Sequence, residues 1–379
     1  KLIDMGKTKN KGEASEFYAF VYILGNQLVP VVDGTLTATN QSVQFNSLKR
    51  ADEDYIFQTE DRIKVLARGD TFYISRKDCK KYAADLLHLL FAQDKIQEDD
   101  PTVQKLFNLL RTEKISAKSQ DKMDFSAEVC EPQSPLSRYL GFSVKSYIGN
   151  DPTVINANRN NSSVRFVILK NGETPTKEEM SPFLNLDEKR LGPKELFSKL
   201  LSEGFTLKYS SCGGEALEYN LRLIDSSLPE ILAQLLVARY VDYETKESFA
   251  SLVKKVAEKP EIPEIAELGD SVSRRENSLT FKLQNFLFAF STGATVSRFW
   301  DGQEQATGGL IIVTKNGRVQ CLELTTRNAI GQYLMNFSYF DNPSTSRHGY
   351  GRVFAEPDGK YYVDMQLQVR IGEKEESES

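Results

Sequence analysis

An aspartate and a lysine stand at a spacing that suits metal-dependent hydrolysis of a phosphodiester. Asp124 opens the alternating run DFSAEV, and Lys145 follows one loop later in GFSVKS. This chemistry needs carboxylates that hold a divalent cation against the scissile phosphate, and a cation beside the attacking water. Side chains two residues apart on a strand point to the same face. A twisted hairpin would therefore bring Asp124, Ser143 and Lys145 to one metal ion and one water.

Ser143 departs from this pattern, because a carboxylate is expected two residues before the lysine. A hydroxyl is a poorer ligand than a carboxylate for a hard cation. The hypothesis therefore requires a further acid from elsewhere in the chain. The alternative is a buried strand on which Lys145 is merely exposed, since so short a pattern also occurs by chance.

The segment 10–26 offers such an acid. Its apolar residues recur at helical spacing, and Gly25-Asn26 is a plausible stop: Phe17, Phe20, Val21 and Leu24. At about 100° per residue, Glu13 and Glu16 fall about 20° and about 40° from Phe20, inside the apolar stripe. Carboxylates are rarely buried without a partner or a metal.

We therefore predict that Glu16 replaces the acid that is missing at Ser143 and that Glu16 and Asp124 are the metal ligands. Glu13 is equally well explained by a structural role, either the helix dipole, which favours acids in a first turn, or helix capping. Asp151 is the alternative acid, because it follows Lys145 closely in the chain.

The elements around this hairpin predict a mixed α+β protein. Helices are expected at 10–26, 80–93, 102–111 and 279–291, and strands at 28–32, 43–48, 55–58, 71–75, 123–130, 140–147, 164–170, 351–354 and 361–369. A second hairpin, 310–314 with 318–322, is predicted from the turn Asn316-Gly317. Residues 152–161 look like a helix or turn, 170–192 like a linker and 193–258 like a mainly helical region. His88 is expected in the core.

Composition narrows the class of protein. The 379 residues include two histidines and four widely spaced cysteines, which argues against multi-histidine metal sites, zinc sites and disulfide frameworks. Net charge is −5, so bulk electrostatic coating of DNA is not indicated. No apolar run approaches the ~20 residues that span a bilayer. We expect a cytoplasmic protein.

Several blocks resemble the HpaII family of type II restriction endonucleases: NKGEASEFY, LGFSVKSYIGNDPTVINAN, FWDGQEQATGGLIIV, NPSTSRHGYG and MQLQVRI. They cover most of the chain apart from roughly 175–275. The resemblance implies a restriction-endonuclease-like PD-(D/E)xK core, a central mixed β-sheet flanked by helices. It also implies Mg²⁺-dependent cleavage of double-stranded DNA at short palindromic sites, such as the CCGG read by the family's namesake.

By this resemblance Asp124, Ser143 and Lys145 form a variant active site. Other nucleases for CCGG-containing sites also carry serine before the lysine and take the missing acid from a following helix. In this chain the first acid after Lys145 is Asp151, and the next one is Glu173. Asp151 is therefore the only acid that follows Lys145 closely.

Two polar segments are candidates for DNA contacts. Asparagine and arginine pair bidentately with adenine and guanine edges, and small hydroxyl residues with an arginine suit phosphates or bases. The candidates are Asn156, Asn158, Arg159 and Asn160, and Ser344, Ser346, Arg347 and His348. The alternatives are a polar loop with Asx turns for the first segment and an ordinary surface turn for the second.

The expected organisation is a catalytic domain at 1–175, a mainly helical region at 176–270, an α/β region at 271–371 that contacts DNA, and a disordered tail at 372–379. A homodimer is expected, because two-fold symmetry suits palindromic DNA. Competing hypotheses are a non-specific or repair nuclease and a DNA-binding protein whose metal site has decayed.

Overall fold

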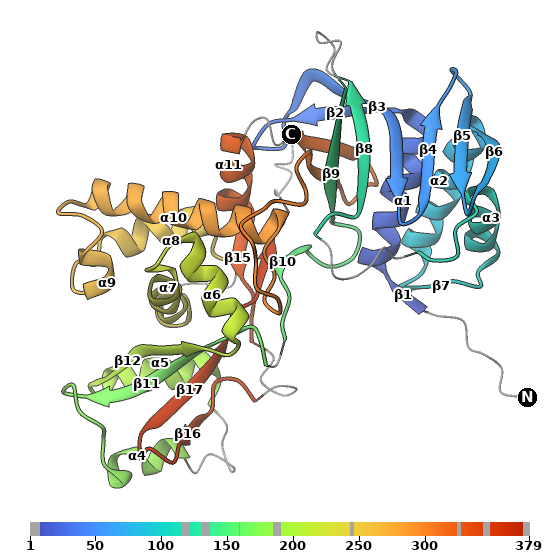
Figure 1. Ribbon diagram of the computed structural model, residues 1–379. Helices are drawn as coiled ribbons and strands as arrows, with labels where there is room; N and C mark the ends of the chain where they lie inside the picture. Colours follow the sequence, from blue (N-terminus) through green and yellow to red (C-terminus); the bar gives the residue numbers. More distant parts are fainter. Residues whose placement is uncertain are drawn as a thin grey trace, which may run out of the picture. The chain divides into compact units, whose positions relative to one another are not determined.

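The computed structural model describes residues 8–115, 122–130, 137–158, 160–184, 191–242, 246–323, 327–343 and 349–373. It is a mixed α/β protein with sheets and flanking helices, as the sequence predicted (Figure 1). Two compact units are present. The first contains 1–152, 291–293 and 304–333, and the second contains 153–290, 294–303 and 334–379. This division follows from contacts within the chain. The division into four regions that the sequence analysis expected stays a prediction.

A nine-stranded sheet in the first unit carries the candidate residues. Its strand order is β2-β14-β13-β9-β8-β3-β4-β5-β6, and β2 also pairs with β3, so the strands from β2 to β3 close a ring. The strands are β2 (Leu28–Val32), β3 (Ala38–Arg50), β4 (Glu53–Phe57), β5 (Arg62–Ala67), β6 (Asp70–Ser75), β8 (Phe125–Cys130), β9 (Ser137–Ser146), β13 (Gly309–Val313) and β14 (Val319–Glu323). A separate pair is formed by β1 (Thr8–Asn10) and β7 (Lys95–Gln97).

The strand β9 lies inside this sheet, with hydrogen-bonded neighbours on both sides. It pairs antiparallel with β8, with Phe125 opposite Phe142, which confirms the predicted hairpin. It pairs parallel with β13, with Lys145 opposite Ile312. The second predicted hairpin, β13 with β14, is also confirmed. An interior strand with two bonded edges is a rigid support for the residues that it carries.

Three helices of the first unit pack with this sheet: α1 (Lys11–Asn26), α2 (Arg76–Ala92) and α3 (Pro101–Leu110). The helix α1 begins where the sequence predicted, because the Asn10 side chain accepts a hydrogen bond from the backbone N–H of Glu13. Aromatic rings join α1 to the hairpin. The Phe20 and Phe125 ring centroids lie 5.8 Å apart, and the Phe125 and Phe142 rings stack at 5.5 Å. These contacts fix α1 against β8 and β9.

The second unit combines a four-stranded sheet, β12-β11-β17-β16, with a three-stranded sheet, β10-β18-β15, and several helices. Its strands are β10 (Thr153–Ile155), β11 (Ser163–Lys170), β12 (Phe205–Cys212), β15 (Ser338–Phe340), β16 (Val353–Ala355), β17 (Tyr361–Gln366) and β18 (Val369–Ile371). Its helices are α4 (Lys177–Leu184), α5 (Pro193–Ser202), α6 (Glu215–Ile224), α7 (Leu228–Asp242), α8 (Phe249–Ala257) and α9 (Pro263–Ala266). The helices α10 (Val272–Thr292) and α11 (Arg327–Phe337) have residues in both units.

Several sequence predictions are wrong in this region. The expected helix or turn at 152–161 contains the strand β10, which is stabilised by pairing with β18, more than 200 positions later in the chain. The expected linker contains α4, and the expected helical region contains β12. Such elements depend on distant partners, which local periodicity does not report. In the first unit, the prediction of a core position for His88 on α2 is also wrong, because this residue is exposed.

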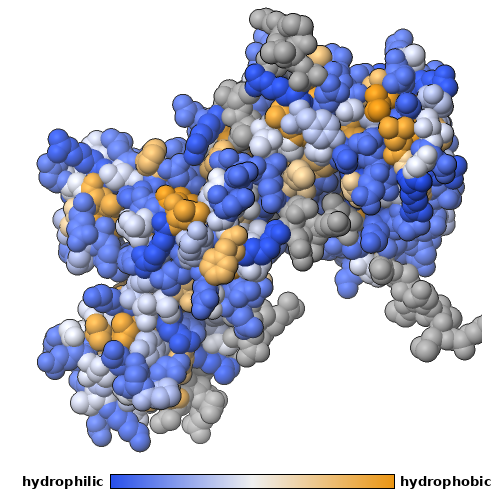
Figure 2. Space-filling view, in the orientation of Figure 1, coloured by the Kyte–Doolittle hydropathy of each residue, from blue (hydrophilic) through white to orange (hydrophobic). Residues whose placement is uncertain are grey.

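The described residues on the face shown in Figure 2 are mainly hydrophilic, with hydrophobic residues in small groups. All four cysteines are free thiols, as the sequence suggested. Within the described residues, no helix is long and apolar enough to cross a membrane.

Gly141 allows a loop to lie against the hairpin. A Cβ atom at this position would stand 2.1 Å from the carbonyl oxygen of Gln305. The backbone N–H of Gly308 also donates to the carbonyl of Gly141, at 2.7 Å.

We predict that Gly141→Ala lowers the free energy of unfolding by about 1–3 kcal/mol, because overpacking against backbone cannot relax easily. Urea unfolding of the two proteins measures the change.

The control is Gly192→Ala, whose new methyl group would meet no atom within 4 Å. Its cost should stay below about 1 kcal/mol, since glycine is only modestly better than alanine at a helix N-cap. Equal stability of the Gly141→Ala variant and the original protein would contradict the close approach.

Candidate active site

Asp124 stands immediately before β8 and reaches across to β9. Its backbone N–H donates to the carbonyl of Phe142 at 2.8 Å. Its carboxylate Oδ2 accepts from the backbone N–H of Val144 at 2.6 Å. These two bonds hold the half-buried carboxylate beside Ser143. Burial raises the pKa of Asp124, while the Val144 bond and the charge of Lys145 oppose that shift.

Ser143 and Lys145 lie two residues apart on β9, and their exposed fractions are 3% and 8%. They therefore share one face of an interior strand. Burial lowers the pKa of Lys145, and the negative charges of Asp124 and Glu16 oppose that shift. Lys145 is thus a buried cation among acids, which contradicts the alternative of an exposed lysine on an ordinary strand.

Glu16 joins this group from α1. Burial raises its pKa well above the usual range, and the negative charge of Asp124 raises it further. The positive charge of Lys145 acts in the opposite direction. The structure therefore brings Glu16, Asp124 and Lys145 close enough for their charges to interact, although Glu16 is more than one hundred positions away from the other two.

Arg50, at the end of β3, is a residue that sequence reasoning missed. It is 7% exposed, and its guanidinium donates to the carbonyls of Lys114, at 3.2 Å, and of Ile115. The same group lies 5.0 Å from the ring centroid of Phe17 and 5.7 Å from that of Phe20. Its charge lowers the pKa of both Asp124 and Glu16. A charged residue at a strand end has no sequence signal that predicts this burial.

Glu13 is explained by helix capping, the alternative that the sequence left open. Its carboxylate accepts from the backbone N–H of Asn10 at 3.3 Å and pairs with Lys9 at 3.3 Å. Asp151, the alternative acid, is half-buried in the segment that follows β9.

The group fits a hard divalent ion that keeps water and phosphate ligands. Mg²⁺ usually takes one or two protein carboxylates and fills its other positions with water and substrate oxygens. Glu16 and Asp124 supply two carboxylates, and a cation between them would relieve the repulsion that raises the pKa of Glu16. Within the described part of the chain, no group of three or more His, Cys, Asp or Glu side chains is arranged to hold a metal.

The candidate DNA-binding residues are only partly described. Asn156 and Asn160 are exposed, in the second unit. The Asn158 Oδ1 accepts from the backbone N–H of Asn160 at 3.1 Å, which is an Asx turn. A structural role thus accounts for the Asn158 side chain. The remaining candidates lie outside the described residues: Arg159, Ser344, Ser346, Arg347 and His348.

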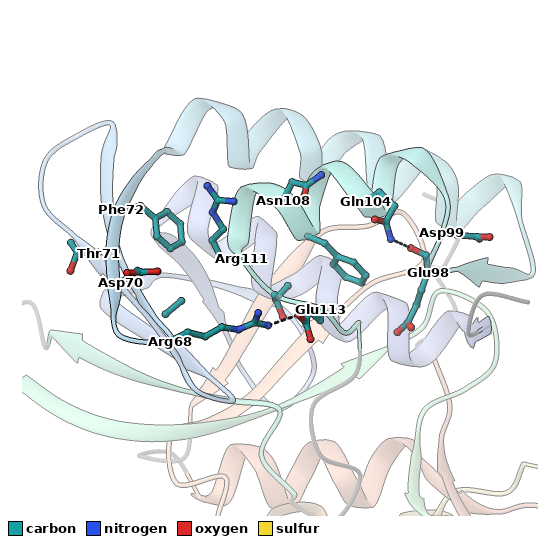
Figure 3. Close-up of a pocket in the computed structure, with 13 residues that line it drawn as sticks. Arg68, Asp70, Thr71, Phe72, Glu98, Asp99, Gln104, Asn108, Arg111 and Glu113 are labelled. Carbon is teal, nitrogen blue, oxygen red and sulfur yellow. Dashed lines mark hydrogen bonds and ion pairs between the residues drawn. The ribbon is translucent and has the colours of Figure 1, made fainter. Parts of the chain in front are cut away.

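A pocket of about 890 Å³ lies elsewhere on the first unit, between the β5–β6 turn and α3 (Figure 3). None of the candidate catalytic residues lines it. Its charged lining comprises Arg68, Asp70, Glu98, Asp99, Arg111 and Glu113, and Arg68 pairs with Glu113 at 2.8 Å. Acids outnumber arginines here, so the pocket does not suit a DNA phosphate.

A buried lysine with two acids on a β-hairpin and an adjacent helix suits phosphodiester hydrolysis, and comparisons with known proteins agree with that class. The sequence profile of the family described as HpaII restriction endonuclease matches residues 10–371. The type II restriction enzyme HpaII of Haemophilus parainfluenzae is 25% identical over 370 residues, which are 96% of this chain and 98% of that protein. No solved structure matches.

The chain therefore belongs to the HpaII restriction endonuclease family, which confirms the resemblance seen in its sequence blocks. This places it among the type II restriction endonucleases, which are site-specific deoxyribonucleases and generally use divalent metal ions.

The raised pKa of Glu16 predicts how its replacement changes stability. A carboxyl group whose pKa is raised on folding stabilises the fold below its unfolded pKa, and that contribution is lost as pH rises through the folded pKa. In metal-free protein, Glu16→Gln should therefore raise the free energy of unfolding at about pH 8 and change it little at about pH 4. Urea unfolding across this pH range measures the difference.

Glu13→Gln is the matched control on the same helix. It should destabilise the protein slightly, because it removes the negative charge that pairs with Lys9 and favours the helix N-terminus, while glutamine can still accept from the Asn10 N–H. A loss of stability at alkaline pH in Glu16→Gln would contradict the electrostatic arrangement described above.

Proposed function

We propose that this protein is a Mg²⁺-dependent type II restriction endonuclease that cuts both strands of duplex DNA at a short specific site related to CCGG. The observation that carries the proposal is the 2.6 Å bond from the Val144 N–H to the Asp124 carboxylate, which holds that carboxylate on the strand that carries Lys145. The charges of Asp124 and Lys145 both act on Glu16. The relative from Haemophilus parainfluenzae supports the class of reaction.

In this proposal Glu16 and Asp124 hold the metal ion, which when bound polarises the scissile phosphate and lowers the pKa of a bound water. The backbone N–H of Asp124 donates to the carbonyl of Phe142, and its carboxylate accepts from the N–H of Val144. These two bonds hold the carboxylate against β9. Lys145 stabilises the negative charge that develops on the attacking oxygen and the phosphate. Ser143 contributes a hydroxyl on the same strand face and no charge, so Glu16 takes the place of the acid expected there.

The hairpin is then a variant PD-(D/E)xK core in which one acid has moved from β9 to α1. We also propose that Asn156, Asn158, Arg159, Asn160, Ser344, Ser346, Arg347 and His348 contact DNA. A homodimer suits the proposal, because a palindromic site has the same two-fold symmetry.

The first test is cleavage of plasmid DNA with Mg²⁺. The original protein should give discrete fragments, whereas a smear would indicate a non-specific nuclease and uncut but bound DNA a decayed site. Lys145→Ala should lose cleavage, by about 100-fold or more, because a preorganised charge at the developing anion is removed. Its affinity for a duplex that contains the site should remain, because phosphate contacts supply most of the binding free energy. Near-normal cleavage by Lys145→Ala would mean that the catalytic strand is misassigned.

The second test decides which acid completes the site. Glu16→Gln keeps the size of the side chain and removes its charge, so Mg²⁺-dependent cleavage should collapse while the fold persists. The Mg²⁺-induced rise in the melting temperature should be lost as well, since a ligand that binds only the folded state stabilises it. Asp151→Asn and Glu13→Gln are the controls and should retain both properties. If Asp151→Asn is inactive and Glu16→Gln cuts normally, the assignment of Glu16 is wrong.

A further inference from the structure

An aromatic ring projects from the segment between α10 and β13. Phe299 is 64% exposed, and its ring meets that of Tyr219 on α6 edge-to-face, with centroids 5.2 Å apart. Tyr219 is itself 48% exposed. Both residues belong to the second unit. Burying an exposed phenylalanine is favourable, so a ring held in water next to a second ring offers contact area to a partner.

Asn220 holds the backbone on both sides of this ring. Its side chain is fully buried, and its Nδ2 donates to the carbonyls of Thr295, at 2.7 Å, and Arg298, at 2.8 Å. Its Oδ1 accepts from the backbone N–H of Trp300 at 2.8 Å. Three bonds from one buried amide thus fix the residues that flank Phe299. Such a ring binds with little further loss of conformational entropy.

Chain connectivity limits how far Phe299 lies from the candidate active site. The Oε1 of Gln305 accepts from the backbone N–H of Lys122 at 2.6 Å, two residues before Asp124. Six residue steps lead from Phe299 to Gln305, and an extended chain spans at most about 3.6 Å per residue, so their Cα atoms lie within about 22 Å. The Gln305 side chain, its bond to Lys122 and the two further steps to Asp124 add at most about 16 Å, so Phe299 lies within about 38 Å of Asp124 however the two units are placed. At 3.4 Å per base pair, this limit corresponds to about eleven base pairs of DNA.

We propose that Phe299 packs against a nucleobase of the bound duplex as an apolar wedge and that Arg298 lies toward the adjacent phosphates. This inference rests on the proposed function, because a nuclease that cuts at Asp124 must hold DNA within this distance. Phenylalanine inserts between base steps in other DNA-binding proteins, and every base offers a face for stacking. Arg298 is exposed beside the ring and supplies the charge that phosphates attract. A hydrophobic partner protein would not require this cation.

The test measures binding to a duplex that contains the cleavage site, which is first mapped with plasmid DNA. Every protein in this test carries Lys145→Ala, so that the duplex is not cut during the measurement. Phe299→Ala should raise Kd by about 5- to 100-fold, the range expected for loss of one base–aromatic stack. Phe299→Trp should restore binding to within about threefold, because it keeps an aromatic face. The control is Phe281→Ala, which removes a phenylalanine that is 66% exposed on α10. It should leave Kd within about twofold.

A base contact also has a spectroscopic signature. We expect 2-aminopurine, placed in turn at positions within about eleven base pairs of the cut, to change its fluorescence on binding at one step, and Phe299→Ala to abolish that change. An unchanged Kd for Phe299→Ala would overturn the proposal. A raised Kd with unchanged fluorescence would place the ring on the sugar–phosphate backbone and also overturn it.

Two outcomes separate this inference from its alternatives. If Phe299→Ala lowers the molar mass measured by light scattering in the absence of DNA, the ring belongs to an interface between two copies of the chain and the proposal fails. If the original protein neither binds nor cuts DNA, the proposed function itself fails, and the contact fails with it. Normal cutting and binding by Phe299→Ala would remove this contact alone and leave the function intact.

Discussion

The candidate site depends on the burial of like charges beside compensating cations. Burial raises the pKa of both Glu16 and Asp124, and the charge of Asp124 raises that of Glu16 further, while Lys145 and Arg50 oppose both shifts. Buried charges are costly unless they are paired. A metal ion that both carboxylates bind would remove the remaining repulsion. In the metal-free protein, this arrangement lowers the free energy of unfolding. In the proposed site, the same arrangement places the charged groups before the metal binds, as is common in active sites.

The surrounding fold keeps these charges in place. Hydrogen bonds on both edges make β9 a rigid interior strand, and the two backbone bonds of Asp124 tie it to that strand. Arg50 connects β3 with α1 and with the chain at Lys114 and Ile115, through ring contacts and carbonyl bonds. Gly141 permits the loop that holds Lys122 to lie directly on the hairpin. Each of these contacts restricts where a carboxylate can move.

The two units divide the proposed tasks of a site-specific nuclease. The first carries the carboxylates and the lysine, and the second carries the asparagine-rich loop and the exposed ring of Phe299. The segment from α10 to β13 belongs to both, with Asn220 fixing one part and Lys122 contacting another. A short stretch of chain therefore connects Phe299 with the residues that contact the hairpin.

From the sequence by itself, the resemblance of long blocks to a known family determined the class of the protein. Periodicity determined the hairpin that carries Asp124 and Lys145 and the inward position of Glu16, because helical and strand periodicities are local properties. The capping role of Glu13 was one of its two alternatives. Only the tertiary structure decided that the charge of Asp124 acts on Glu16, that the buried Arg50 acts on both and that β10 is a strand. These results follow from contacts between residues far apart in the chain, and the free energy of such contacts overrides local propensity.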